Sequence, residues 1–266
     1  MSKIVIVVRT ILFHLAVGAL VLAFVPTAPL FFTSDRRRAR RLILRFLGVM
    51  RLLLRWIAGI DERIEGIANL PPGPYLLASR HESAWEVLFF SLFFDDPAAF
   101  AKQEIFANPL GGLFARIGGH IGIDRHGDLA GVKAAFEAAR QTVAAGRSIL
   151  IFPSGTRHVE GRDRIQPGVS ALYELLKVPC VPVTLDSGRC WPPGSWLRYP
   201  GTIRVRIGRP IAAGLDRRRF MAELREGLGL AAEEVGRPSA SAPPPAVPSA
   251  SGEGRRPGVD ARVIEP

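Results

Sequence analysis

The first sixty residues constrain the fold most, because a long apolar stretch stands directly before a block of arginines. Residues 4–32 are almost wholly apolar, and counting from Ile4 to Val25 gives about the twenty residues that a membrane span needs. Eight arginines then fall between Arg36 and Arg55, with no acidic residue among them. A basic segment beside an apolar one is typical of attachment to anionic lipid. The sequence therefore predicts a pair of membrane-associated helices, with the arginines and the remainder of the chain on the cytoplasmic side of the inner membrane.

The formal net charge of +11 is compatible with nucleic acid or with an anionic membrane as partner. The sequence has no zinc-finger spacing and no RNA-binding aromatic motif, so we predict membrane lipids as partners and no nucleic acid. DNA binding through residues 36–55 is the weaker alternative. A secretory signal peptide is another alternative, because Lys3 and Arg9 resemble its basic start, but no cleavage site is evident.

Residues 40–57 have the pattern of a helix that lies in the plane of the lipid headgroups. At about 100° per residue, ten apolar residues from Leu42 to Ile57 fill one half of the helix surface. The other half carries five arginines, which are Arg40, Arg41, Arg45, Arg51 and Arg55. A basic face opposite a broad apolar face predicts an interfacial helix, and an ordinary amphipathic helix packed on the domain is the alternative.

From residue 61 the chain alternates short apolar runs with helical windows. The predicted strands are 75–78, 121–123, 148–152, 181–185 and 203–207. The predicted helices are 84–94, 129–145, 169–176 and 217–228. This alternation predicts an α/β domain with a central mixed sheet flanked by helices. Because Pro, Ser, Ala and Gly dominate from residue 236, the predicted units are membrane-associated helices (1–60), the α/β domain (61–235) and a disordered tail (236–266).

The segment His81-Glu82-Ser83-Ala84-Trp85-Glu86 offers an imidazole and a carboxylate that could act together as a base. Residues five apart do not share a face of one helix, but they can meet if His81 precedes the helix and Glu86 lies in its first turn. Ser83 and Glu86 also match a capping box, and the local sequence does not decide between capping and catalysis.

The segment Phe152-Pro153-Ser154-Gly155-Thr156-Arg157 follows a predicted strand, where α/β folds place ligand loops. Arg157 could bind phosphate bidentately, and a plain turn is the alternative interpretation. Arg125, after a glycine-rich segment, is a second candidate for phosphate binding, and Lys102 is a weaker one. The histidines lack zinc-site spacing, so no metal is expected. The two cysteines, Cys180 and Cys190, fit a reducing compartment.

Taken in order, these blocks resemble the glycerolipid acyltransferase family, in particular the bacterial 1-acyl-sn-glycerol-3-phosphate acyltransferases. His81 to Glu86 is similar to the family's His-x4-Asp block, and Phe152 to Arg157 is similar to its Phe-Pro-Glu-Gly-Thr-Arg block. The segments 123–125 and 181–183 correspond to its Ile-Asp-Arg and Val-Pro-Val blocks. The resemblance covers roughly residues 61–210.

The resemblance implies acyl transfer to lysophosphatidic acid, with phosphatidic acid as the product and a role in phospholipid biosynthesis. His81 would take the proton of the sn-2 hydroxyl and Glu86 would orient His81. The acyl donor would be acyl-CoA or acyl carrier protein, with no further cofactor. The acceptor would be held by Arg125, Arg157, Ser154, Gly155, Thr156 and Lys102.

Two residues depart from the family pattern. Glu86 stands where the family usually has aspartate, and Ser154 stands where it usually has glutamate. The second change leaves open another lyso-lipid acceptor, such as a lyso-ornithine lipid. Together the two changes also leave open a membrane protein that binds lipid without turnover.

Overall fold

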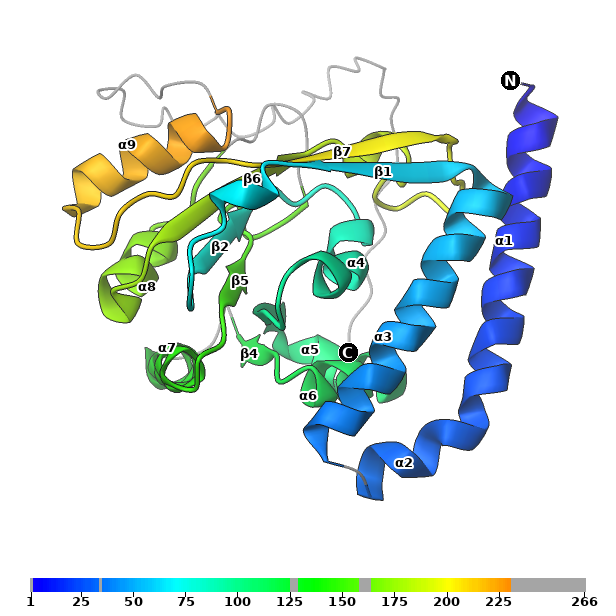
Figure 1. The fold of residues 1–266 in the computed structure, drawn as a ribbon, viewed down its shortest axis with the longest axis horizontal. Helices are drawn as coiled ribbons and strands as arrows, with labels where there is room; N and C mark the ends of the chain where they lie inside the picture. The colour runs from blue at the N-terminus through cyan, green and yellow to red at the C-terminus, as the bar shows by residue number, and fades with distance from the viewer. Residues whose placement is uncertain (1, 34, 125–128, 158–163, 231–266) are drawn as a thin grey trace, which may run out of the picture. The chain divides into compact units, whose positions relative to one another are not determined.

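The computed structural model describes residues 2–33, 35–124, 129–157 and 164–230 (Figure 1). The helices are α1 (Lys3–Phe24), α2 (Ala28–Thr33), α3 (Arg36–Leu53), α4 (Trp85–Phe93), α5 (Gln103–Ala107), α6 (Pro109–Ile117), α7 (Leu129–Ala144), α8 (Gly168–Leu176) and α9 (Arg217–Gly227). The strands are β1 (Ile60–Glu65), β2 (Leu76–Ser79), β3 (Ala98–Lys102), β4 (Ile121–Ile123), β5 (Ile149–Ile151), β6 (Cys180–Leu185) and β7 (Gly201–Ile207). The predicted boundary at residue 235 and the predicted tail lie outside the described residues.

Within the described residues, seven strands form one mixed sheet in the order β1-β7-β6-β2-β5-β3-β4. The strands from β6 to β4 are parallel to their neighbours, whereas β7 runs antiparallel to β6 and parallel to β1. Because β6, β2, β5, β3 and β4 all point the same way, their carboxyl ends lie along one edge of the sheet. Loops at this edge are where open α/β sheets bind ligands.

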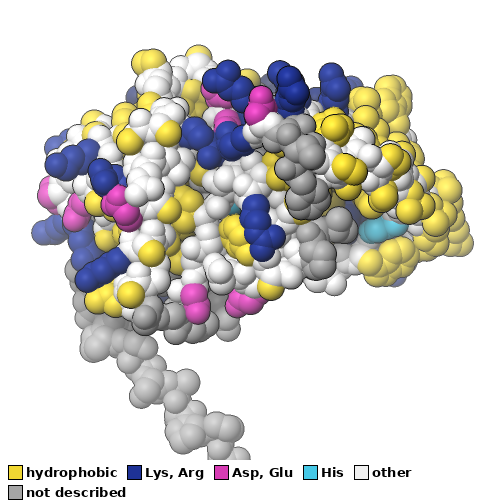
Figure 2. All heavy atoms as spheres, turned by 90° about the horizontal axis from the view of Figure 1, so that it is seen from below, with side chains coloured by type: hydrophobic (Ala, Val, Ile, Leu, Met, Phe, Trp, Pro, Cys, Tyr) yellow, Lys and Arg dark blue, Asp and Glu magenta, His cyan; other side chains and the backbone are white. Residues whose placement is uncertain are grey.

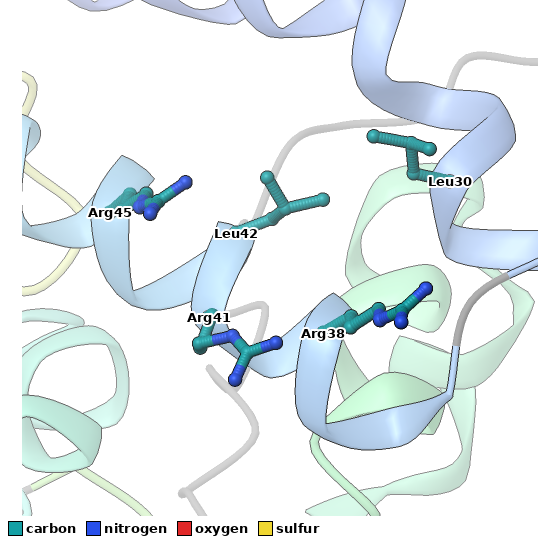
Figure 3. Close-up of a pocket in the computed structure, with 5 residues that line it drawn as sticks. All are labelled: Leu30, Arg38, Arg41, Leu42 and Arg45. Atoms are coloured by element: carbon teal, nitrogen blue, oxygen red, sulfur yellow. The ribbon is translucent and has the colours of Figure 1, made fainter.

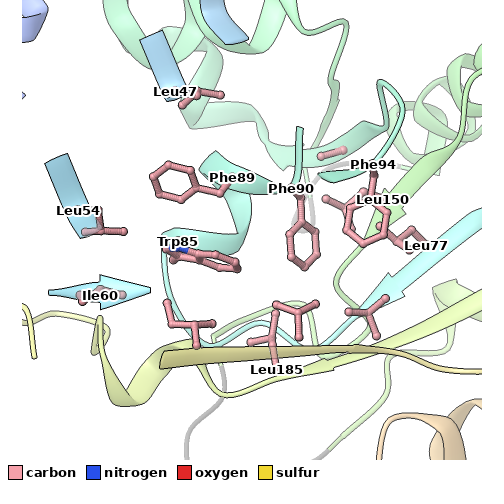
Figure 4. Packing of buried hydrophobic residues seen from close by; sticks show 14 of the residues in the cluster. Leu47, Leu54, Ile60, Leu77, Trp85, Phe89, Phe90, Phe94, Leu150 and Leu185 are labelled. Atoms are coloured by element: carbon pink, nitrogen blue, oxygen red, sulfur yellow. The ribbon is translucent and has the colours of Figure 1, made fainter. Parts of the chain in front are cut away.

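Both faces of the sheet are buried, which explains why the central strands read as continuous apolar runs. On one face, Leu77 and Leu150 belong to a core cluster that also contains Leu47 of α3 and Trp85 and Phe89 of α4 (Figure 4). On the other face, Leu76 and Ile149 of the same strands pack against α7, α8 and α9. The predicted α/β fold, with a mixed sheet and helices on both of its faces, is confirmed.

All five predicted strands form, and each of the four predicted helices is present within a residue or two of its predicted bounds. Two strands, β1 and β3, and two short helices, α5 and α6, were not predicted from the sequence. Strand β1 extends the sheet beyond β7, whereas β3 lies between the predicted strands β5 and β4.

The amino-terminal helices pack on the sheet domain rather than standing apart from it. The apolar stretch forms α1, whose Arg9 donates from Nε to the Ile57 carbonyl at 2.6 Å. The amide of Arg198 donates to the hydroxyl of the buried Thr10 at 3.1 Å. The polar side of α1 therefore contacts the domain. Among the residues that the structure describes, one helical segment, Lys3–Leu30, is long and apolar enough to cross a membrane.

Helix α3 contradicts part of the helical-wheel prediction, because its apolar half does not form one exposed face. Ile43, Leu47 and Met50 are buried in the core that α3 shares with the sheet. Val49 and Trp56, which the prediction places on the same apolar half, are 40% and 75% exposed. The alternative of a helix packed on the domain therefore describes one side of α3, and the interfacial interpretation can apply only to the other.

Candidate active site

Three neighbouring parallel strands bring the candidate residues to one edge of the sheet. In the register, Ala78 of β2 lies beside Ile151 of β5, and Ser79 lies beside Val183 of β6. His81 therefore follows the central strand by two residues, while Phe152 directly follows its neighbour on one side. The loop after β6, which lies on the other side of β2, carries Ser187, and this serine also reaches the same edge.

His81 and Glu86 are hydrogen-bonded, as the catalytic interpretation requires. Nδ1 of His81 lies 2.8 Å from Oε1 of Glu86. The histidine precedes α4 and the glutamate lies in its first turn, so the helix start folds the carboxylate back toward the imidazole. An ionised carboxylate only accepts hydrogen bonds, so Nδ1 carries a proton, and in the neutral imidazole Nε2 then keeps its lone pair. The His81 side chain is 15% exposed, whereas that of Glu86 is fully buried.

The carboxylate of Glu86 is held by four further hydrogen bonds. Oε1 accepts from the backbone amides of Glu82 and Ser83, each at 2.7 Å. Oε2 accepts from the hydroxyls of Ser83 at 3.0 Å and Ser187 at 2.7 Å. Burial alone would raise the pKa of Glu86, but these bonds and His81 outweigh it and hold the pKa below its usual value. Glu86 is therefore a buried anion at neutral pH.

Capping and the His81–Glu86 pair coexist in the structure. Glu86 accepts from the amide of Ser83, which is half of the predicted capping box. The other half differs from the predicted capping box. The helix begins at Trp85 with Ala84 as its N-cap, and the Ser83 hydroxyl accepts from the amide of Trp85 at 2.9 Å. One carboxylate thus both satisfies the helix start and orients the imidazole.

The two sequence blocks that lie about seventy residues apart are in direct contact. The ring of Phe152 stacks on the imidazole of His81, with centroids 4.2 Å apart and an interplanar angle of 22°. The stack covers one face of the imidazole and, with the bond to Glu86, fixes the plane in which Nε2 points. His81 and the predicted phosphate loop therefore lie side by side.

The segment after Phe152 is an ordered turn. The amide of Gly155 donates to the Phe152 carbonyl at 2.9 Å, and Gly155 has φ of 74°, which favours glycine. The Ser154 hydroxyl donates to the Thr156 carbonyl at 2.7 Å, so it supports the turn. Thr156 and Arg157 are exposed beyond it. The plain-turn alternative is thus correct for the backbone, and the turn leaves the guanidinium accessible at the site edge.

Of the two remaining candidates for phosphate binding, Lys102 and Arg125, only Lys102 lies within the described residues. Lys102 ends β3 and is exposed, and its register partner is Ile123 at the end of β4. Since β3 lies beside β5, Lys102 reaches the same edge as the Phe152 turn. Arg125, two residues after Ile123, lies outside the described residues.

Ser187 is a site residue that the sequence analysis missed. It follows β6 by two residues and is fully buried, with its hydroxyl on Glu86 and 3.1 Å from that of Ser83. Its position just beyond the carboxyl end of a predicted strand was a signal, because His81 occupies the equivalent place after β2. Ser187 lies 101 positions along the chain from the carboxylate that it contacts, so no local pattern could reveal the contact.

His120, a histidine of the glycine-rich segment, has a structural role. Its Nδ1 accepts from the amide of Ala99 at 3.0 Å, which ties the start of β4 to β3. Burial first, and then the positive charge of Arg147, lower the pKa of His120 from 6.5 to about 4. The imidazole is therefore neutral and acts as an acceptor near neutral pH.

The lowered pKa of His120 predicts a measurable loss of stability in mild acid. Between pH 6.5 and about 4 the unfolded chain binds a proton at this residue and the folded chain does not, so stability falls as the pH falls. Between pH 6.5 and 5, the unfolding free energy of His120→Gln should therefore fall by about 1.5 kcal/mol less than that of wild type. Chemical denaturation in detergent at the two pH values measures this, with His14→Gln as a control. Parallel losses in all three proteins would contradict the prediction.

Comparisons with known proteins identify the family of this chain. A family model described as Acyltransferase matches residues 62–186, which include the whole site except Ser187 and the loop beyond it. The 1-acyl-sn-glycerol-3-phosphate acyltransferase of Pseudomonas aeruginosa is 32% identical over 224 residues, covering 82% of this chain and 86% of that protein. The mouse 1-acyl-sn-glycerol-3-phosphate acyltransferase alpha is 27% identical, covering 62% of this chain and 60% of its own length.

A solved structure shows the same fold. The 1-acyl-sn-glycerophosphate acyltransferase of Thermotoga maritima superposes with a TM-score of 0.67, covering 85% of this chain and 94% of that one at 21% identity. That likeness supports the fold, while the Pseudomonas relative, which is similar over most of both chains, supports the family. The chain therefore belongs to the 1-acyl-sn-glycerol-3-phosphate acyltransferase family and is an enzyme that transfers an acyl group to an alcohol.

Proposed function

We propose that this enzyme acylates the sn-2 hydroxyl of lysophosphatidic acid, using an acyl thioester of CoA or acyl carrier protein, and forms phosphatidic acid. The observation that carries the proposal is the His81–Glu86 hydrogen bond, which leaves Nε2 of His81 as a free base beside the turn that ends in Arg157. The names of the relatives support the same acceptor.

In the proposed mechanism, Nε2 of His81 takes the hydroxyl proton as the oxygen attacks the thioester carbonyl carbon. Buried, anionic Glu86 stabilises the imidazolium through Nδ1. A new C–O bond forms, and the C–S bond then breaks. The leaving sulfur takes the proton from the imidazolium, so the products are an ester and a free thiol and His81 returns to its starting state.

The acceptor phosphate is proposed to lie at the carboxyl edge of β5 and β3. Arg157 offers a planar pair of donors for phosphate, and Lys102 adds a second positive charge at the same edge. The hydroxyl of Thr156 and the turn at Ser154 and Gly155 complete the proposed phosphate loop. Arg125 remains a proposed contributor. The ordered Glu86 network gives no support to the alternative of lipid binding without turnover.

Membrane attachment is proposed to occur through the outer side of α1. Ile4, Leu15 and Leu22 are 74%, 65% and 72% exposed, and Figure 2 shows hydrophobic side chains gathered over this helix, at the right of the view. Because Arg9 and Thr10 are engaged by the domain on the other side, α1 would enter the bilayer laterally with the domain attached. The proposed location is the cytoplasmic face of the inner membrane, as the arginines of α3 indicate.

The proposed acceptor is tested with the purified full chain, an acyl-CoA or acyl carrier protein donor, and a panel of lyso-lipids. Wild type should form phosphatidic acid from lysophosphatidic acid and react poorly with a lyso-ornithine lipid, which lacks phosphate. Arg157→Ala should raise KM for lysophosphatidic acid about tenfold or more, because a charge-assisted phosphate contact is lost. Arg217→Ala, an exposed arginine on α9, is the control. A preference for the lyso-ornithine acceptor, or an unchanged KM, would contradict the proposal.

A further inference from the structure

We propose that Arg38, Arg41 and Arg45 form a binding site for the phosphate of an anionic phospholipid headgroup, at the corner between α2 and α3. The proposal rests on the membrane attachment proposed above and adds a specific contact to it. We refer to these three residues as the outer arginine row.

Seven of the eight arginines in α3 and its following turn divide into two sets, and the eighth, Arg37, belongs to neither. One set is paired with acidic side chains of the domain, and its ion pairs are Arg36–Asp96 at 2.7 Å, Arg40–Asp96 at 2.9 Å, Arg55–Asp61 at 3.3 Å and Arg51–Glu62. Within the part of the chain that the structure describes, the guanidinium groups of the outer arginine row have neither an ion pair nor a hydrogen bond. The charge on that side of α3 is therefore not needed to hold the domain together.

The outer arginine row is arranged on one side of the helix. Residues three and four apart lie on the same helix face, so Arg38, Arg41 and Arg45 form a line over two turns. All three are exposed. Like charges at this spacing repel one another, and a bound anion would relieve that repulsion.

The row borders a hollow with apolar walls. A space of about 550 Å³ is lined by Leu30 of α2, the three arginines and Leu42 of α3. Figure 3 shows Leu42 directed toward Leu30 across the space between the two helices, with Arg38 and Arg45 on either side of Leu42. Guanidinium groups beside an open apolar space match the junction between a phosphate headgroup and an acyl chain.

The surface around the hollow favours a membrane as the source of the anion. Val25 and Leu30 lead from the end of α1 into the hollow and are 57% and 46% exposed. Beyond the row, the same side of α3 continues with Val49 and Leu52 and ends near Trp56, which is 75% exposed. Exposed apolar residues at both ends of a basic row favour a bilayer over a soluble acidic protein, because the bilayer covers both kinds of surface.

The test compares binding of the full chain to vesicles of phosphatidylcholine alone and of phosphatidylcholine with about one third phosphatidylglycerol, at physiological ionic strength. Replacing all three residues with glutamine should weaken binding to the anionic vesicles on the order of 100-fold and leave binding to the neutral vesicles within about twofold. Arg41→Gln alone should cost about fivefold. The matched control is the triple variant Arg209→Gln, Arg217→Gln and Arg218→Gln, which removes the same charge from exposed positions elsewhere.

Three outcomes would overturn the proposal. Equal losses in both triple variants would show that only net charge matters, and unchanged binding in the outer-row variant would show that the row has no part. If the outer-row variant bound vesicles like wild type but reacted more slowly with acyl carrier protein as donor, and not with acyl-CoA, the row would instead bind the carrier protein. Acyl transfer in uncharged detergent micelles, measured in parallel, reports on the active site and so separates a failure here from a failure of the proposed reaction.

Discussion

His81→Ala should lower kcat about 10³-fold, because it removes the group that we propose takes the proton from the attacking hydroxyl. The imidazole is held in place for this step by a 2.8 Å hydrogen bond to Glu86 on one side and by the stacked ring of Phe152 on one face. Neither contact occupies the lone pair of Nε2, which lies in the plane of the ring. The assay is single-turnover formation of phosphatidic acid at saturating lysophosphatidic acid.

Two controls make the His81 result specific. His14→Ala changes a histidine of α1 whose Nδ1 lies 2.7 Å from the Thr10 carbonyl, and it should leave kcat near wild type. Phe152→Leu keeps apolar cover on the imidazole without the stacked ring and should lower kcat by less than His81→Ala does. If His81→Ala turned over at the wild-type rate with its fold intact, His81 would not be the base.

The sheet could be predicted where its strands are apolar and could not where they are charged or alanine-rich. Central strands such as β2 and β6 are buried on both faces, so their runs of apolar residues were recognisable. β1 has the sequence Ile-Asp-Glu-Arg-Ile-Glu and lies at the edge of the sheet, where its charged residues reach solvent or α3. β3 begins with two alanines, which favour helix over strand, and it forms only because β5 and β4 lie on either side.

The arginines of α3 show a different limit of the sequence. A helical wheel uses only the angle between successive residues, so it places five arginines together on one polar half. They are Arg40, Arg41, Arg45, Arg51 and Arg55. The partners that separate them are Asp61, Glu62 and the Asp95–Asp96 pair, which the fold brings against one side of the helix. Which arginines are neutralised is therefore a property of the tertiary structure.

The candidate site shows the same contrast within a few residues. His81 and Glu86 are close in sequence, so helix geometry could predict both their contact and the competing capping role of Glu86. Ser187 supports that carboxylate from another strand, and only the parallel register of β2 and β6 brings it there. Glu86, which stands where the family usually has aspartate, thus accepts hydrogen bonds from two serine hydroxyls at Oε2. These bonds explain how the longer side chain is held in one position.

Glu86→Gln should lower kcat about 10³-fold while leaving KM for the acceptor nearly unchanged. The amide keeps the size of the side chain but loses the negative charge that stabilises the imidazolium, and it presents an amide group where the structure requires only acceptors. Because hydrogen bonds hold the pKa of Glu86 below its usual value, the wild-type carboxylate stabilises the fold at neutral pH, and that contribution is lost as the pH falls through the lowered pKa. Glu86→Gln should accordingly be less stable than wild type at pH 7, with a difference that shrinks in acid.

Ser187→Ala is a milder change to the same carboxylate and complements the Glu86→Gln variant. It removes one of the two hydroxyls on Oε2 but leaves the charge and the bond to His81, so kcat should fall only about tenfold. In the double variant with Glu86→Gln, the loss of Ser187 should add little, because the hydroxyl acts through the carboxylate and has no other role in the reaction. The measurement is kcat for the four proteins of the cycle, each checked for folding by thermal unfolding. Additive losses would show that Ser187 acts independently of Glu86, whereas a strongly non-additive cycle would place the two residues in one catalytic unit with His81.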